Sequence, residues 1–272
     1  MKLTLVGAWV VTVLLLGAAM TATASANEPP EWGRCVKVES PKRGVGYTAS
    51  TCITRAKPTA LGKYEWAPAA QPENLRFSGA GGETELKTVG HPTIKCVAAN
   101  ISGEYTGAKT ASVTIELQAC NNPSSTLCKS PNATATGEIL TVPLSAEIGF
   151  TRHEEVNGHL VVAVGMDLKP TPPLTALASY ECTGEGESAM VEGSVIGKLS
   201  PINKMSEATD VAFLVKKTTG LQVPESFQEG PKDTLSTTYA NGLETSGPFA
   251  STLNIVAETG SNSTPIEIKG LE

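Results

Sequence analysis

Residues and motifs that are typical of several enzyme and metal-binding classes are missing from this chain of 272 residues. Aspartate occurs only at positions 167, 210 and 233, so an Asp-rich calcium-binding loop cannot be assembled. No Gly-x-Ser-x-Gly motif is present, which disfavours the hydrolases that carry their nucleophile in that motif. No Cys-x-x-Cys pair is present either, which disfavours a structural zinc site. We therefore expect no cofactor.

An excess of positive charge is also lacking, because the formal net charge is −6. A nucleic-acid-binding protein needs a basic face to neutralise phosphates, so we expect no nucleic acid among the partners. Apolar residues make up 40% of the chain, which is enough to form a hydrophobic core at this length. The chain is therefore expected to be globular rather than disordered.

The first 26 residues have the pattern of a signal peptide. Leu3–Met20 is an almost uninterrupted apolar run, and residues 24–26 have the small-x-small spacing that signal peptidase accepts. The alternative is an N-terminal membrane anchor, which this small-residue exit disfavours. No later apolar run approaches the ~18 residues that are needed to cross a bilayer. We expect a mature chain that begins at Asn27, has no membrane span, and works in the cell envelope or outside the cell.

The six cysteines fit the oxidising compartment that export implies. Short, turn-rich spacings favour the pairs Cys35–Cys52 and Cys120–Cys128. Cys96 and Cys182 then remain, both in strand-like runs, and we expect them to form the third disulfide. Each disulfide contributes about 2–4 kcal/mol to stability, mainly because it restricts the unfolded chain.

Strand-like runs separated by proline and glycine recur along the chain, whereas helical periodicity is almost absent. The alternation is clearest where Val113, Ile115 and Leu117 share one face and polar residues share the other. The predicted fold class is all-β: a two-sheet antiparallel sandwich, jelly-roll-like or Greek-key, over residues 71–272. Residues 27–70 are expected to form an N-terminal segment that is stapled by a disulfide.

The chain around position 155 is expected to form an antiparallel hairpin. Apolar residues occupy even positions before and after the turn, and both sets face the core only if paired residue numbers have an even sum. A two-residue turn at Asn157-Gly158 breaks this rule. We therefore predict a three-residue loop, 156–158, that pairs Glu155 with His159.

Two candidate sites follow from this register. His153, Glu155 and His159 lie together at the tip and are candidate ligands for a transition metal. Glu147 lies opposite Asp167, and opposed carboxylates are a candidate acid/base pair for a hydrolase. The alternative for both sites is a solvated polar face that neither binds a metal nor takes part in catalysis.

The aromatic residues near the N-terminal cysteines are candidate ligand-binding residues. Tyr64 and Trp66 are two positions apart and therefore lie on one face of a strand, and Trp32 is close to the same stapled segment. Exposed rings of this kind can bind sugars, because the C–H faces of a sugar stack on them. The alternative is that the rings fill a small core beneath the Cys35–Cys52 disulfide.

Several motifs resemble those of a known family. They are Glu31-Trp-Gly-Arg-Cys-Val-Lys-Val38, Gly46-Tyr47 up to Cys52, Gly62-Lys-Tyr-Glu-Trp66, Thr93-Ile-Lys-Cys96, the Cys120–Cys128 loop and Glu192-Gly-Ser-Val-Ile-Gly197. The family consists of secreted, cysteine-containing all-β proteins of high-GC Gram-positive bacteria and has no known activity. The resemblance covers most of the chain after the leader and implies export and a shared fold. It assigns no functional residue.

These features favour a secreted, non-catalytic binding protein of the cell envelope or the extracellular space, with cell-wall or extracellular polysaccharide as its partner. A secreted hydrolase that uses Glu147 and Asp167 is the alternative. A purely structural component of the envelope is the third hypothesis. The sequence leaves the oligomeric state open.

Overall fold

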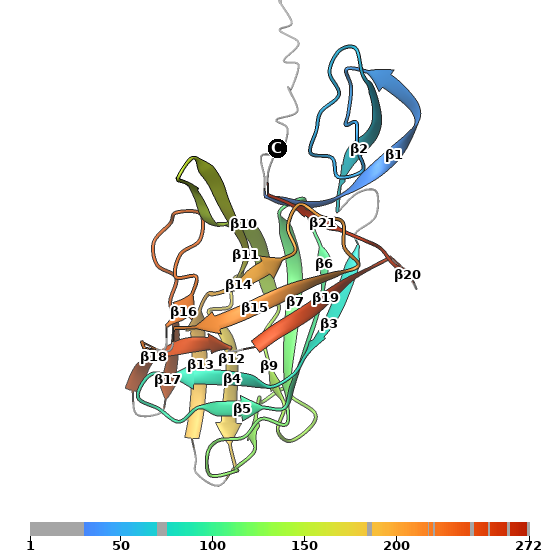
Figure 1. Ribbon diagram of the computed structural model, residues 1–272. Coiled ribbons are helices and arrows are strands. Elements are labelled where there is room, and N and C mark those ends of the chain that lie inside the picture. The colour runs from blue at the N-terminus through green and yellow to red at the C-terminus, as the bar shows by residue number, and fades with distance from the viewer. Residues whose placement is uncertain are drawn as a thin grey trace, which may run out of the picture.

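The computed structural model describes residues 30–69, 75–183, 187–216, 218–219, 221–239, 242–249, 251–259 and 262–270. This part of the chain consists of antiparallel strands, turns and loops (Figure 1). It contains no helix, and therefore none that is long and apolar enough to cross a membrane. The expected signal peptide, residues 1–26, and the expected boundary at residue 70 lie outside the described residues.

The strands form three sheets. The largest runs, in spatial order, through β16 (Gln222–Val223), β15 (Ala208–Val215), β14 (Val195–Ser200), β11 (His159–Pro170), β10 (Leu144–Val156), β7 (Thr110–Gln118), β6 (Ala98–Tyr105), β3 (Arg76–Gly81), β19 (Ser251–Thr259) and β20 (Asn262–Ser263), with β9 (Ile139–Leu140) beside β7. This sheet curls, because β15 pairs with β19 as well as with β14.

The second sheet runs through β5 (Ile94–Cys96), β4 (Thr84–Thr88), β18 (Gly242–Phe249), β17 (Leu235–Tyr239), β13 (Glu187–Gly193), β12 (Ala176–Cys182) and β8 (Cys128–Lys129). The third sheet has the order β2 (Leu61–Pro68), β1 (Glu31–Arg43) and β21 (Glu267–Lys269). Its third strand comes from the opposite end of the chain. All of the pairings between these strands are antiparallel, which confirms the predicted fold class.

The hydrophobic core lies between the two larger sheets. Ile101 and Ile115 contribute to it from the curled sheet, and Leu177 and Val191 contribute from the second sheet, all with at most 2% of their surface exposed. Along β7, buried and more exposed residues alternate as the sequence predicts. Burial of one face of each sheet therefore holds the sandwich together.

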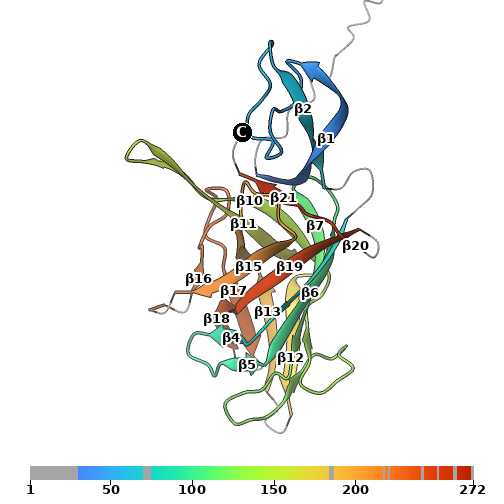
Figure 2. The same cartoon turned by 45° about the vertical axis from the view of Figure 1, so that its right-hand side comes forward.

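The N-terminal module, defined as residues 30–69 together with β21, projects from one end of this body (Figures 1 and 2). The Cys35–Cys52 disulfide staples it, with 5.6 Å between the two Cα atoms, as predicted. Trp32 packs its ring on that of Tyr105 in the body, 5.1 Å away. The module is thus anchored by the Trp32 side chain and by the C-terminal strand.

The other two predicted disulfides are wrong. Cys96 is bonded to Cys120, and Cys128 is bonded to Cys182. Strand pairing explains the exchange, because Cys128 lies directly opposite Cys182 in the β8–β12 pair. The backbones of Lys95 and Asn121 hydrogen-bond to each other, which brings the neighbouring Cys96 and Cys120 together. Sequence spacing was a poor guide, since both disulfides join backbone segments that hydrogen-bond to each other.

The hairpin of β10 and β11 confirms the inner part of the predicted register and contradicts the turn. Ile148 lies opposite Met166, as expected. At the tip, however, Val156 pairs with His159 across a two-residue Asn157-Gly158 turn, in which both residues have positive φ. A bulge between Phe150 and Arg152 shifts the register by one residue.

The even-sum rule therefore holds only where the hairpin is buried. Leu144 and Val164 are fully buried, whereas Leu140, Val142 and Val162 are only half-buried. Beyond the bulge the hairpin projects away from the body (Figure 2), and no core selects the face on which its apolar residues lie.

Candidate functional site

A bulge in β1 opens the ladder between the two long strands of the N-terminal module. Pairing runs regularly from Gly33 opposite Pro68 to Lys37 opposite Tyr64, and then resumes with Lys42 opposite Gly62. Residues 38–41 of β1 therefore face a single residue of β2. One of the four is a proline, which has no backbone N–H to donate to a ladder.

The loop that follows β1 supports β2 at this opening. The backbone N–H of Tyr47 donates to the carbonyl of Tyr64 at 2.8 Å, and the N–H of Lys63 donates to the carbonyl of Tyr47 at 2.8 Å. The loop approaches so closely that a Cβ on Gly62 would lie 1.5 Å from the carbonyl oxygen of Val45. The glycine at this position is what allows the loop and the strand to meet.

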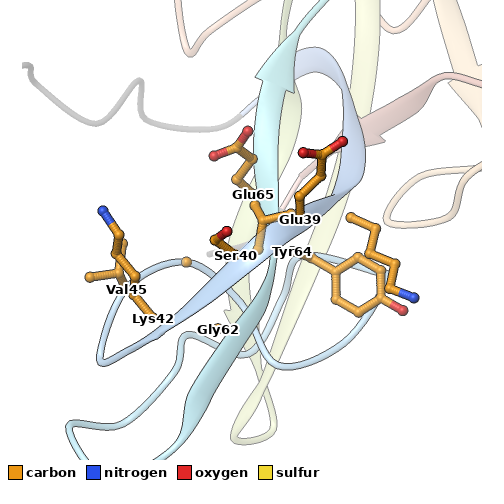
Figure 3. Close-up of a pocket in the computed structure, with 10 residues that line it drawn as sticks. Glu39, Ser40, Lys42, Val45, Gly62, Tyr64 and Glu65 are labelled. Carbon is orange, nitrogen blue, oxygen red and sulfur yellow. The ribbon is translucent and has the colours of Figure 1, made fainter.

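The opening forms a pocket of about 440 Å³ (Figure 3). Its lining residues are Lys37, Val38, Glu39, Ser40, Lys42, Val45, Gly46, Gly62, Tyr64 and Glu65. Figure 3 shows the carboxylates of Glu39 and Glu65 on the same side of the opening, with Lys42 and Val45 together on another side. Neither Lys37 nor Lys42 forms an ion pair with another described residue. The pocket thus offers charged and hydroxyl groups that are available to a ligand.

Only one of the three predicted aromatic residues lines this pocket. Tyr64 does so, whereas Trp32 is 3% exposed and belongs to the core beneath the module. Trp66 is half-buried, and its ring lies against Gly33, where a Cβ would come within 2.4 Å of it. The structure therefore assigns a packing role to the two tryptophans and leaves Tyr64 as the candidate ligand-binding ring.

Charged side chains are buried on the same face of the module, beside Trp66. Lys269 is 3% exposed, and its Nζ donates to the hydroxyl of Tyr47 at 2.8 Å and lies 5.1 Å from the centre of the Trp66 ring. Glu267, two residues away on β21, is fully buried. Burial raises the pKa of Glu267 to about 7, against the opposing effect of Lys269.

Sequence reasoning missed this buried charge cluster of Glu31, Glu267 and Lys269. Glu31 pairs directly with Lys269 in the β1–β21 ladder, so the two side chains share a face. Nothing in the sequence indicated that the last strand would join the first. Neither carboxylate oxygen of Glu267 has a hydrogen-bond partner within the described part of the chain. An unpartnered buried carboxylate destabilises the module whenever it is ionised.

The candidate catalytic carboxylates do lie opposite each other, but they do not form an open site. Glu147 is paired with Asp167, as predicted. Asp167 is 1% exposed, and the Nζ of Lys169 lies 2.5 Å from its Oδ2. Burial raises the pKa of Asp167, while Lys169 lowers it. The side-chain amide of Gln228 donates to Glu147 at 3.3 Å.

The loop that carries Gln228 lies over the sheet at this point. A Cβ on Gly149 would come within 2.4 Å of the Phe227 ring and within 2.7 Å of the Gln228 side chain. Because the loop covers this part of the sheet and Asp167 is almost inaccessible, a substrate cannot place a bond between the two carboxylates. The hydrogen bond from Gln228 to Glu147 helps to hold the loop on the sheet.

The candidate metal ligands are divided between the two faces of the hairpin. The observed register puts His153 and Glu155 on one face and His159 on the other. The ring of His153 lies against that of Phe150, with 4.5 Å between the centres. Within the described residues, no group of three His, Cys, Asp or Glu side chains is arranged to hold a metal ion. The predicted metal site depended on the three-residue loop, and it is lost with that loop.

Comparison with known proteins adds no candidate residue to these. No protein-family model matches the sequence. No curated protein and no solved structure matches it either.

Proposed function

We propose that this chain is a secreted, non-catalytic binding protein of the cell envelope or extracellular space, and that its ligand is a polysaccharide held in the pocket of the N-terminal module. One observation carries the proposal. The pocket of about 440 Å³ is lined by Tyr64 together with charged and hydroxyl residues, with the Tyr64 ring and the Lys42 side chain on opposite sides of the opening (Figure 3).

The chemistry of the pocket suits a sugar. The carboxylates of Glu39 and Glu65 can accept hydrogen bonds from sugar hydroxyls, and Lys37 and Lys42 can donate to sugar oxygens. The Tyr64 ring supplies a flat apolar surface for the C–H face of a sugar ring. A site with one ring and several polar groups therefore suits a sugar, which has both hydroxyl groups and an apolar C–H face.

Export is supported by the cysteines. All three described disulfides are formed, and no free cysteine is found in the described part. Disulfides persist in oxidising compartments, which include the cell envelope and the extracellular space. The leader-like first 26 residues and the resemblance to secreted all-β proteins support the same location.

A non-catalytic role is supported by the state of the carboxylate pair. A general acid or base has to come within hydrogen-bond distance of the proton that it transfers. Asp167 is 1% exposed and in contact with Lys169, so it does not meet this requirement.

Replacing Tyr64 by alanine tests the proposal. We expect Tyr64→Ala to lower retention on insoluble polysaccharide by up to about tenfold, since a stacked ring contributes up to roughly 1.5 kcal/mol. Tyr64→Phe keeps the ring and should keep most of the binding. Thermal unfolding of both variants checks that the module is folded. Undiminished retention of a folded Tyr64→Ala protein would show that the pocket is not the site.

A further inference from the structure

The charge of the chain is distributed unevenly between the module and the body. Residues 30–69 contain seven lysine and arginine residues and three glutamates. The whole chain contains 21 basic and 27 acidic residues, so the remainder has 14 basic and 24 acidic ones. A basic module therefore projects from an acidic body (Figure 1).

The positive charge of the module lies on its surface. Six of the seven basic residues within residues 30–69 are exposed, namely Lys37, Lys42, Arg43, Arg55, Lys57 and Lys63. Of the three glutamates in this range, Glu31 is buried, so Glu39 and Glu65 are the exposed ones. The surface of the module therefore has an excess of four positive charges over residues 30–69.

Five of these six residues have no ion-pair partner among the described residues, whereas Arg55 lies over the Tyr47 ring. Lys37, Lys42, Arg43, Lys57 and Lys63 form no ion pair with any residue that the structure describes. Elsewhere in the described chain, exposed lysines do pair with carboxylates, as Lys87 does with Glu85 at 2.7 Å. The lining of the pocket holds two lysines and the carboxylates of Glu39 and Glu65, so the excess of cations belongs to the surrounding surface, where it raises the local concentration of anions.

Lys37 and Lys42 border the opening in the β1–β2 ladder on its two sides and both line the pocket. Arg43 follows directly in β1, and Lys63 is the β2 residue opposite the bulge. A ligand in the pocket would therefore have two lysines in its lining and two further cations at neighbouring positions of the two strands.

We propose that the polysaccharide bound by the N-terminal module is an anionic one, whose repeating carboxylate or phosphate groups contact the exposed lysines in and around the pocket. This inference rests on the proposed function, and it names the class of polysaccharide. Lysine ammonium groups on flexible stems suit anions at variable spacing better than the planar fork of arginine does.

A polynucleotide is a poorer match to the same cations. Single-stranded nucleic acids bind to several aromatic rings on which successive bases stack, and the pocket has only Tyr64. A duplex needs a broad basic face, whereas the chain outside residues 30–69 has ten more acidic than basic residues.

The test compares four polymers on the disulfide-bonded full chain: hyaluronan, a phosphomannan, dextran and single-stranded DNA. We expect one or both of the first two to bind, and their relative affinity distinguishes a carboxylate from a phosphate ligand. Binding should weaken at least about tenfold when NaCl is raised from about 50 to about 500 mM, because salt screens exposed charges. Dextran should bind much more weakly.

Paired charge-removing variants locate the effect. Lys37→Gln/Lys42→Gln should weaken binding to the anionic polysaccharide at least about tenfold and reduce its salt dependence. Lys129→Gln/Lys198→Gln removes the same charge from the body and should leave binding unchanged. Both variants should retain the wild-type melting temperature.

The alternative outcomes are distinguishable. Equal, salt-insensitive binding of dextran would overturn the anionic ligand and leave the polysaccharide-binding function in place. Tighter binding of single-stranded DNA than of either anionic polysaccharide would overturn the inference in favour of a polynucleotide. Failure of all four polymers to bind would overturn the inference and the proposed function together.

Discussion

Glu267→Gln is expected to raise the free energy of unfolding by about 3 kcal/mol at pH 8 and to leave it nearly unchanged at pH 4. The carboxyl group is fully buried and its pKa is raised from 4.5 to about 7. Each unit of pKa difference corresponds to about 1.4 kcal/mol of differential stability. Below pH 4.5 the group is protonated in both the folded and the unfolded chain, so it has no effect.

Between pH 4.5 and 7 the unfolded chain releases this proton and the folded chain keeps it. Stability conferred by the protonated group is therefore lost as the pH rises through this window, and it is fully lost above pH 7. Glutamine is neutral at every pH and should remove this part of the dependence. Urea unfolding at several pH values measures it, with the exposed Glu207→Gln as the control. A parallel pH profile for wild type and Glu267→Gln would contradict the burial of an unpartnered carboxylate.

Gly62→Ala is expected to unfold the N-terminal module while the body stays folded. The new Cβ would lie 1.5 Å from the carbonyl oxygen of Val45, a distance that requires the loop to leave β2. Overpacking of this kind costs about 3 kcal/mol or more. The loop contributes Tyr47, which binds β2 and accepts the hydrogen bond of Lys269, so the whole module is affected.

Limited proteolysis measures the effect of Gly62→Ala, with new cleavage expected within residues 30–69 and protection retained in the two larger sheets. Gly82→Ala is the matched control, since nothing lies within 4 Å of the position that its Cβ would occupy. Equal resistance of Gly62→Ala and Gly82→Ala to protease would contradict the close contact between the loop at Val45 and β2 at Gly62.

Patterns within short stretches of the sequence predicted those features of the fold that depend on residues close together in the chain. Alternation in β7 identified its buried face, because successive side chains of a strand point to opposite sides. The spacing of Cys35 and Cys52 identified the staple of the module. The register around Ile148 and Met166 followed from the need to bury two apolar sets on one face.

The remaining features depend on contacts between distant parts of the chain. The Cys128–Cys182 disulfide follows from the pairing of β8 with β12, which are 54 residues apart at these cysteines. The bulge between Phe150 and Arg152 joins the even-sum register of the buried part to an odd-sum register at the tip. The exposed tip then adopts the two-residue turn that Asn157-Gly158 favours. The tip followed its local turn preference because no core opposed it.

The candidate site was only partly predictable. Tyr64 was identified because an aromatic ring near an N-terminal staple is a reasonable ligand-binding residue. The pocket itself arises from the bulge between Lys37 and Lys42. The sequence indicates that bulge only through a proline within the strand. Glu267 and Lys269 reach the module only because β21 pairs with β1.

Hydrogen exchange of the full chain, with and without polysaccharide, tests most directly whether the module is the binding site. Hyaluronan, a phosphomannan and dextran serve as probes for the wild type and for Tyr64→Ala. With at least one polymer, we expect slower amide exchange in residues 37–46 and 62–65 of the wild type, and no change in Tyr64→Ala. Protection confined to the body, or equal protection in both proteins, would contradict a polysaccharide site in the N-terminal module.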